Sequence, residues 1–260
     1  MNTTKENKPI DLQVATWGDV KTGGYSFAVL PWGATEPHNY HLPYLTDWYI
    51  AHDIAVDSVT KAQSQFGVLG MTLPPIPLGT QNRGQKELPF CIHTRYKTQF
   101  MVLTDIVDSL CLQGIRLLIL LNGHGANSSS FKSMIRDLAF DYPDMTIVCV
   151  DWFAVEPQKN YFENIDDHAG EMETSVIMHY HPELVRLERA GDGASTPFNI
   201  EGLNAKVGWV PRQWDKVSQD TGVGDPRKAT AEKGKCYAEA ITDKIAKLMN
   251  DLVKQSIYMI

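Results

Sequence analysis

Short apolar runs alternate with amphipathic stretches along most of the chain. Four runs are apolar enough to predict buried strands, and they cover residues 26–31, 67–73, 115–121 and 146–150. Four stretches with apolar residues at three- and four-residue spacing predict helices at about residues 46–59, 100–110, 131–140 and 230–253. This alternation predicts a three-layer α/β/α sandwich with a mostly parallel central sheet, built as a single domain over residues 1–260.

Local signals mark helix ends and one long loop. Thr46 precedes the first helical stretch and is a candidate N-cap, because its side-chain oxygen can accept a hydrogen bond from a free backbone N–H. Gly114 follows the second stretch, where a glycine often ends a helix in the left-handed conformation. Residues 74–90 form a proline- and glycine-rich segment, and loops of this length are often functional.

The composition argues against several classes of partner. The chain has 24 Lys and Arg against 31 Asp and Glu, a net charge of −7, and no basic run, so we expect neither nucleic acid nor an anionic membrane as a partner. No apolar stretch approaches the roughly 20 residues of a membrane span, and the polar start MNTTKENKPI lacks the apolar region of a signal peptide. The four cysteines show no CxxC spacing and fit reduced thiols. These features predict a cytoplasmic protein.

Three loops that follow predicted strands carry acidic residues and histidines. These residues are Glu36, His38, His41 and Asp47 in loop 32–47, His124 in loop 122–127, and Asp166, Asp167, His168, Glu171 and Glu173 in loop 166–175. Ligands of open α/β sheets bind beyond the carboxyl ends of the strands, so we expect these side chains to share one site. Imidazole and carboxylate are common ligands of zinc, manganese and iron.

The residues alone leave two interpretations of these clusters open. A single histidine or glutamate in a loop is more often a capping or solvated side chain than a ligand. Three clusters at three strand ends fit that explanation less easily. Glu36 and His38 are two positions apart, so their side chains point the same way if the segment is extended. A metal site is therefore the more specific of the two hypotheses.

Four motifs resemble those of the creatininase family, which comprises creatinine amidohydrolases and related formamide hydrolases. The segment GATEPHNYHLPYLTD at 33–47 is similar to the family's first motif, approximately G-A-x-E-x-H-G-x-H-L-P-x-x-x-D. Three later segments resemble the other motifs: NGHGAN at 122–127, HAGEMETS at 168–175 and GVGDPRKATAEKG at 222–234. The motifs follow the family order and cover most of the chain.

The resemblance implies a site with two divalent metal ions, with zinc favoured and manganese or iron as alternatives. Glu36 and His124 would hold one ion, His38 would hold the other, and Asp47 would bridge them. His168 would be the general acid/base, and the preceding Asp167 could orient it. The implied reaction is hydrolysis of a non-peptide C–N bond, in a cyclic amide such as creatinine or in a formamide, by a metal-activated water. The family also implies a homo-oligomer, commonly a ring-like hexamer, that acts on a small-molecule amide.

The chain departs from the creatininase pattern where one metal ligand is expected. In creatininase itself the N-G-H motif continues with a glutamate, but that position is Ala126 here. Glu171 is the candidate replacement, because it lies three residues after His168 and would share a helix face with it. Glu173 belongs to the same motif and is either a ligand or a structural carboxylate. Asn39 stands where the family usually has glycine.

Two other functions compete with hydrolysis. A binding protein that keeps the fold and some metal affinity but has lost turnover would explain Ala126, and it is distinguished by whether Glu171 or Glu173 restores the second ion. A nucleotide-binding protein is a weaker reading, because no GxGxxG or GxxxxGK[ST] sequence follows any predicted strand.

Overall fold

Four parallel strands form the central sheet of the computed structural model, which describes residues 8–259. The strands are β1 (Phe27–Trp32), β2 (Gly70–Thr72), β3 (Leu117–Asn122) and β4 (Thr146–Asp151). Their order in the sheet is β2-β1-β3-β4, and each neighbouring pair is parallel. The predicted parallel α/β sheet is therefore confirmed, with β2 shorter than its apolar run.

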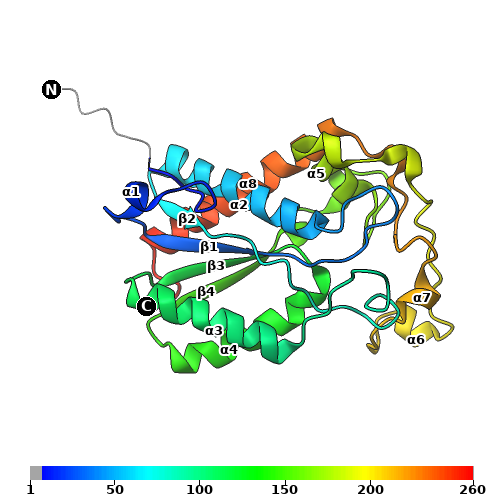
Figure 1. Ribbon diagram of the computed structural model, residues 1–260, viewed down its shortest axis with the longest axis horizontal. Coiled ribbons are helices and arrows are strands. Elements are labelled where there is room, and N and C mark those ends of the chain that lie inside the picture. Colours follow the sequence, from blue (N-terminus) through cyan, green and yellow to red (C-terminus); the bar gives the residue numbers. More distant parts are fainter. Residues whose placement is uncertain (1–7, 260) are drawn as a thin grey trace.

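Helices cover both faces of this sheet (Figure 1). One face carries α2 (Thr46–Phe66), α5 (Glu171–Tyr180) and α8 (Ala231–Lys254), and the other carries α3 (Tyr96–Leu112) and α4 (Ser128–Asp141). Alternate residues of each strand point to opposite faces. Val29 packs in the core under α2 and α8, whereas its neighbour Leu30 packs in the core under α3 and α4. Two apolar cores thus hold the three layers together.

Short helices lie mainly in the long connections after β4. They are α6 (Glu201–Asn204) and α7 (Trp214–Val217), whereas α1 (Trp17–Val20) precedes β1. Single 3-10 turns occur at Gly125–Asn127, Trp152–Ala154, Gln158–Asn160, Pro182–Leu184, Leu187–Arg189 and Pro226–Lys228. Figure 1 shows α6 and α7 beyond the carboxyl ends of the strands, at the right of the view. The sequence pattern predicted none of these short helices.

The helix-end predictions had different outcomes. Thr46 is not the N-cap of α2, because the cap is Leu45 and the Thr46 hydroxyl instead donates a hydrogen bond to the Pro43 carbonyl at 2.7 Å. Gly114 adopts a φ of 82° directly after the C-cap of α3, so the predicted glycine stop is confirmed.

Two glycines let the start of α2 approach the ends of the strands. A Cβ on Gly33, just after β1, would lie 2.5 Å from the backbone nitrogen of Trp48. A Cβ on Gly123, just after β3, would collide with the Asp47 carbonyl. Only glycine permits such close contact between backbones. The first turn of α2 is therefore fixed over the carboxyl ends of β1 and β3.

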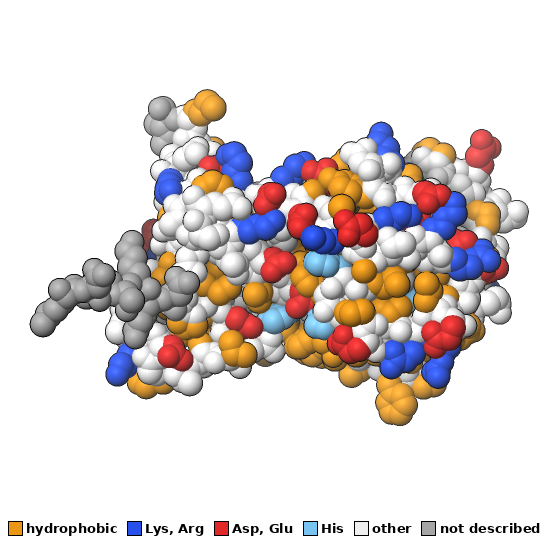
Figure 2. Space-filling view, turned by 90° about the horizontal axis from the view of Figure 1, so that it is seen from above, with side chains coloured by type: hydrophobic (Ala, Val, Ile, Leu, Met, Phe, Trp, Pro, Cys, Tyr) orange, Lys and Arg blue, Asp and Glu red, His pale blue; other side chains and the backbone are white. Residues whose placement is uncertain are grey.

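Charged side chains of both signs lie on the surface of the protein. On the face shown in Figure 2, Lys and Arg side chains are interspersed with Asp and Glu and do not form a basic patch. Within residues 8–259 no helix combines the length and apolarity that crossing a membrane requires. Residues 1–7 of the polar N-terminal stretch lie outside the described residues.

Candidate active site

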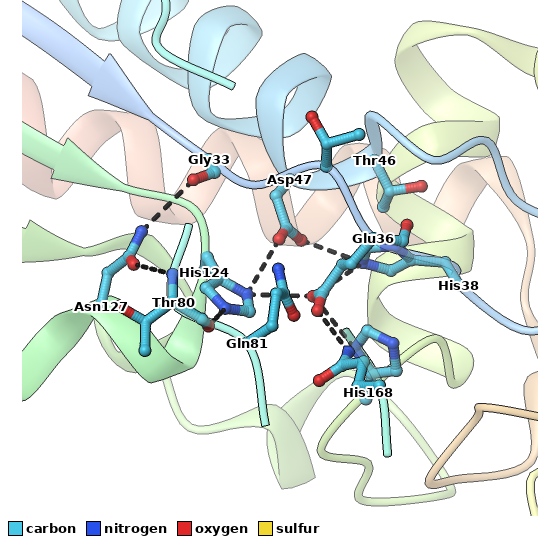
Figure 3. A network of polar contacts seen from close by, with 12 residues as sticks. Gly33, Glu36, His38, Thr46, Asp47, Thr80, Gln81, His124, Asn127 and His168 are labelled. Carbon is cyan, nitrogen blue, oxygen red and sulfur yellow. Dashed lines mark hydrogen bonds and ion pairs between the residues drawn. The ribbon is translucent and has the colours of Figure 1, made fainter. Parts of the chain in front are cut away.

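Six acidic and histidine side chains, all largely or fully buried, converge beyond the carboxyl ends of β1 and β3. They are Glu36, His38, Asp47, His124, His168 and Glu173. Five of the six are labelled in Figure 3, and the sixth is Glu173. The six residues come from four separate segments: the loop after β1, the first turn of α2, the loop after β3, and the region where α5 begins. The structure thus brings together six of the residues that the sequence placed in loops after predicted strands.

Glu36, Asp47 and His124 form one compact group. The Nδ1 atom of His124 lies 2.9 Å from Glu36 Oε1 and 3.1 Å from Asp47 Oδ2. The opposite nitrogen, Nε2, is 2.7 Å from the Thr80 carbonyl, which can only accept, so Nε2 carries the hydrogen and donates it. In the neutral ring, Nδ1 therefore presents a lone pair to two carboxylates (Figure 3).

His38 meets the other side of Asp47 in the same way. Its Nδ1 donates a hydrogen bond to the Glu36 carbonyl at 3.1 Å, and its Nε2 lies 3.0 Å from Asp47 Oδ1. Burial alone would lower the pKa of His38, but Asp47, Glu173 and Glu36 raise it above its ordinary value. The surroundings of this ring therefore favour positive charge at its Nε2 side.

Glu173 completes a second group with His38 and Asp47, in which one candidate ligand atom from each residue lies within 4.8 Å of the others. Its Oε2 accepts a hydrogen bond from the Ala169 N–H at 2.5 Å, which fixes the carboxylate. Burial raises the pKa of Glu173, because ionisation without a nearby cation is costly in this position.

The donor atoms fit two divalent cations. Asp47 Oδ2 is buried and has no hydrogen-bond partner among the described residues, although His124 Nδ1 faces it at 3.1 Å. Lone pairs that face one another at this distance repel unless a proton or a cation lies between them. Two buried imidazoles with their outer N–H groups anchored on carbonyls are a common arrangement for metal ligands. The two groups that share Asp47 therefore match a dinuclear site.

Glu171 does not join this cluster, which corrects the expectation that it replaces the missing ligand. Its carboxylate is fully buried but accepts hydrogen bonds from the backbone N–H groups of Glu163 and Asn164, at 3.1 and 2.8 Å. It also forms an ion pair with Lys233 at 2.6 Å. Lys233 belongs to the last sequence motif, so Glu171 ties that motif to α5.

His168 lies at the cluster, but Asp167 does not orient it. The Nε2 of His168 donates a hydrogen bond to the Pro37 carbonyl at 3.0 Å, and its Nδ1 faces Glu36 Oε1 at 3.7 Å. Asp167 is half exposed and pairs with Arg212. The backbone carbonyl of Pro37 and the indole of Trp214, which lies perpendicular to the imidazole with the ring centroids 5.4 Å apart, orient His168 instead. Burial lowers the pKa of His168, so the ring is neutral near pH 7.

Asn39 shows how the chain tolerates its departure from the family's glycine. Its φ is 54°, in the left-handed region that asparagine adopts more readily than most residues. Its side-chain oxygen accepts hydrogen bonds from the N–H groups of Tyr40 and Gly191. The substitution therefore preserves the backbone path of the first motif.

A cavity of about 300 Å³ opens beside the cluster. Its walls include Gln85, Ala126, Arg212 and Trp214, none of which the sequence reading assigned a binding role. Gln85 belongs to the long proline- and glycine-rich segment 74–90, and its side-chain amide donates a hydrogen bond to Glu36. The length of its loop was the only sequence feature that indicated a functional role for Gln85. No sequence feature indicated such a role for Arg212 or Trp214, which lie in an irregular segment.

Sequence comparison identifies a family model and related proteins that match this chain. The family model described as creatinine amidohydrolase (Creatininase) matches residues 13–249. The mycofactocin precursor peptide peptidase of Mycobacterium ulcerans (strain Agy99) is 29% identical over 226 residues, which cover 85% of this chain and 83% of that protein. The 3-dehydro-scyllo-inosose hydrolase of Thermotoga maritima is 26% identical over 250 residues, which cover 87% of this chain and 78% of that protein.

Solved structures share the same fold. A Bacteroides fragilis NCTC 9343 protein provisionally assigned as a creatinine amidohydrolase is 57% identical, with a TM-score of 0.95 over 97% of this chain and 100% of that one. A creatininase is 21% identical, with a TM-score of 0.77 over 96% of this chain and 100% of that one. Creatininase structures with TM-scores of 0.76 and 0.75 include a manganese form and a Zn-Zn form.

Proposed function

Because the chain belongs to the creatininase family, we propose that it is a hydrolase that uses two divalent metal ions to cleave a non-peptide C–N bond, in a cyclic amide or a formamide. The observation that carries this proposal is that two imidazole nitrogens closely approach the two carboxylate oxygens of Asp47. The imidazoles of His38 and His124 each direct the nitrogen that is not anchored on a backbone carbonyl at a carboxylate oxygen of Asp47, at 3.0 and 3.1 Å. Bound cations would satisfy all of these atoms at once.

Each ion would be held by one histidine and two carboxylates. Glu36, Asp47 and His124 would bind one, and His38, Asp47 and Glu173 would bind the other. Glu173 would thereby supply the ligand that Ala126 cannot. The donors are nitrogen and oxygen without thiolate, which suits zinc, with manganese or iron as alternatives. Divalent cations in these positions would polarise the scissile carbonyl and make water a better nucleophile near neutral pH.

His168 would carry the proton during the reaction. Its Nε2–H is committed to the Pro37 carbonyl, so its Nδ1 is the free basic atom beside Glu36. Because its lowered pKa keeps the ring neutral, Nδ1 can accept a proton from the attacking water and then deliver it to the leaving nitrogen. Gln85 would hold Glu36 in place by donating to its second oxygen.

The relatives do not single out one substrate, since their names describe a peptide, a cyclic inosose and creatinine. The test is an assay of purified protein against creatinine, other cyclic amides and formamides. We expect turnover of at least one compound, its loss after chelation, and its return when zinc or manganese is added. Turnover that survives complete metal removal would contradict the proposal. Metal binding without turnover of any compound would favour the alternative of a metal- and ligand-binding protein.

A further inference from the structure

One cationic side chain reaches the cavity beside the cluster. Among the described residues that line it, Arg212 is the only lysine or arginine, whereas five are aspartate or glutamate. Three of these acids, Glu36, Asp47 and Glu173, are assigned above to metal ions. Apart from the proposed metal ions, Arg212 is therefore the group on this wall that can attract an anionic part of a substrate.

Arg212 is held in a defined position relative to the catalytic groups. Its guanidinium lies over the indole ring of Trp214, 4.6 Å from the ring centroid, and the same indole makes a T-shaped contact with the imidazole of His168. The backbone N–H of Trp214 donates to the Arg83 carbonyl at 2.7 Å, which fastens the segment to the loop that carries Gln85. The indole of Trp214 thus contacts both Arg212 and His168, the proposed acid/base.

The existing partner of Arg212 can be exchanged at little cost. Its ion pair with Asp167 spans 2.5 Å, but the Asp167 side chain is 56% exposed and that of Arg212 is 34% exposed. An ion pair this exposed contributes little to stability, because water screens it and solvates each partner when the pair opens. The guanidinium has five N–H donors, so a second carboxylate can also bind beside Asp167.

A second hollow continues from this position. It has a volume of about 1040 Å³ and shares Asp166, Asp167, Trp209, Val210 and Arg212 with the first cavity. Its other walls include apolar side chains from the segment around α6, among them Phe198, Leu203 and Val207. The wall at Arg212 is therefore bordered on one side by the metal-binding cluster proposed above and on the other by this second hollow, whose walls also include polar side chains such as Asn204 and Lys206.

From this arrangement we propose that Arg212 is a specificity-determining residue that binds a carboxylate of the substrate, and that the apolar side chains of the second hollow, Phe198, Leu203 and Val207 among them, contact the substrate's side chain. The inference rests on the proposed amide hydrolysis and narrows its substrate class to carboxylate-bearing amides, such as N-formyl or N-acyl derivatives of apolar amino acids. Arginine suits this task, because its planar guanidinium binds carboxylate through two parallel hydrogen bonds.

The test compares N-formyl-norleucine with N-formyl-norleucinamide, which carry the same formamide and side chain and differ in charge. Formate release is measured with metal-loaded wild type, Arg212→Gln and Arg212→Lys. Arg189→Gln is the matched control, because Arg189 is an exposed arginine outside both hollows. Calorimetric titration of both compounds into His168→Ala protein, with and without Arg212→Gln, measures binding separately from turnover.

We expect wild type to prefer the acid about 10- to 100-fold, mainly through KM, since a hydrogen-bonded charge pair contributes at this level. Arg212→Gln should abolish the preference, Arg212→Lys should keep part of it, and Arg189→Gln should leave it unchanged. An acid preference that Arg212→Gln does not reduce, or no binding of either compound at 10 mM, overturns the inference. An Arg212-dependent preference in binding without turnover of either compound would support Arg212 and count against the proposed reaction instead.

Discussion

Glu171 and Glu173 lie two positions apart in the first turn of α5 but have unrelated environments. Successive helical residues are about 100° apart, so these two side chains point to nearly opposite sides of the helix. Glu173 faces His38 and Asp47, and Glu171 faces Lys233. The sequence reading chose Glu171 by its spacing from His168, but the helix begins only at Glu171, so helical spacing does not apply to that pair.

The two glutamates give a matched pair of variants. We predict that Glu173→Gln lowers the metal content from two ions per chain towards one, because an amide is a weaker ligand than a carboxylate. Glu171→Gln should keep both ions and instead lower the melting temperature, since Lys233 loses its buried partner at a cost of about 1–3 kcal/mol. Metal analysis and thermal unfolding of both variants check this, and the reverse pattern would restore Glu171 as the ligand.

His168 provides the clearest prediction about turnover. Replacing it with alanine should lower kcat about 10²- to 10⁴-fold on any substrate found, because general acid/base catalysis contributes at this level. Metal content should stay at the wild-type value, since the two proposed ligand groups do not include His168. An unchanged kcat would remove His168 from the mechanism. A loss of metal would instead indicate the alternative group of Glu36, His38 and His168.

At the scale of elements, the position of Asp47 depends on the contact between α2 and the loop after β3. Gly123→Ala should push the first turn of α2 away, because its Cβ would collide with the Asp47 carbonyl. We expect weaker metal binding and a loss of stability of about 1–3 kcal/mol, typical of overpacking. Gly125→Ala, two residues along, is the control, since a Cβ there meets nothing within 4 Å. Equal effects of the two substitutions in a metal titration would refute this account.

Asp166 links α5 to the cavity and makes stability depend on pH. Burial raises its pKa from 3.8 to about 7, while its Oδ2 accepts a hydrogen bond from the Met172 N–H at 2.8 Å. The folded protein therefore holds this proton more tightly than the unfolded chain does. Its free energy of unfolding should fall by roughly 1–4 kcal/mol as the pH rises from about 4 to about 7.

Asp166→Asn removes this titration but keeps an oxygen for the Met172 N–H. We predict that the melting temperature of the variant, relative to wild type, is higher at pH 8 than at pH 5. The comparison uses the same buffer ions and metal content at both pH values. A difference between variant and wild type that does not change with pH would show that Asp166 is ionised throughout this range.

The elements that the sequence predicts well are those with regular patterns. Continuous apolar runs identified all four strands. The central strands β1 and β3 are fully buried because helices cover both faces of the sheet, whereas β4 at its edge is mostly half-buried. Because ligands of open α/β sheets bind at the carboxyl ends of the strands, the sequence also predicted that Glu36, Asp47 and His124 share one site. Arg212 and Trp214 escaped because irregular loops have no periodicity, and only the folded chain shows which loops meet.

At the scale of the whole molecule, the alternation of apolar runs and amphipathic stretches predicted the three layers, which the structure confirms. The resemblance to the creatininase family is confirmed by the family model that matches residues 13–249. The replacement for Ala126 could not be predicted in this way, because it depends on where α5 begins and how it rotates against α2. The homo-oligomer, a hexamer by resemblance, stays a prediction.

The central claim is a dinuclear site bridged by Asp47, and metal stoichiometry tests it most directly. Elemental analysis of purified protein, after loading with zinc and removal of excess, should give two ions per chain in wild type and fewer than one in Asp47→Ala, because both ions lose a ligand. Asp53→Ala, on the same helix but outside the cluster, should keep two ions. Two fully bound ions in Asp47→Ala, or no bound ion in wild type, would contradict the account.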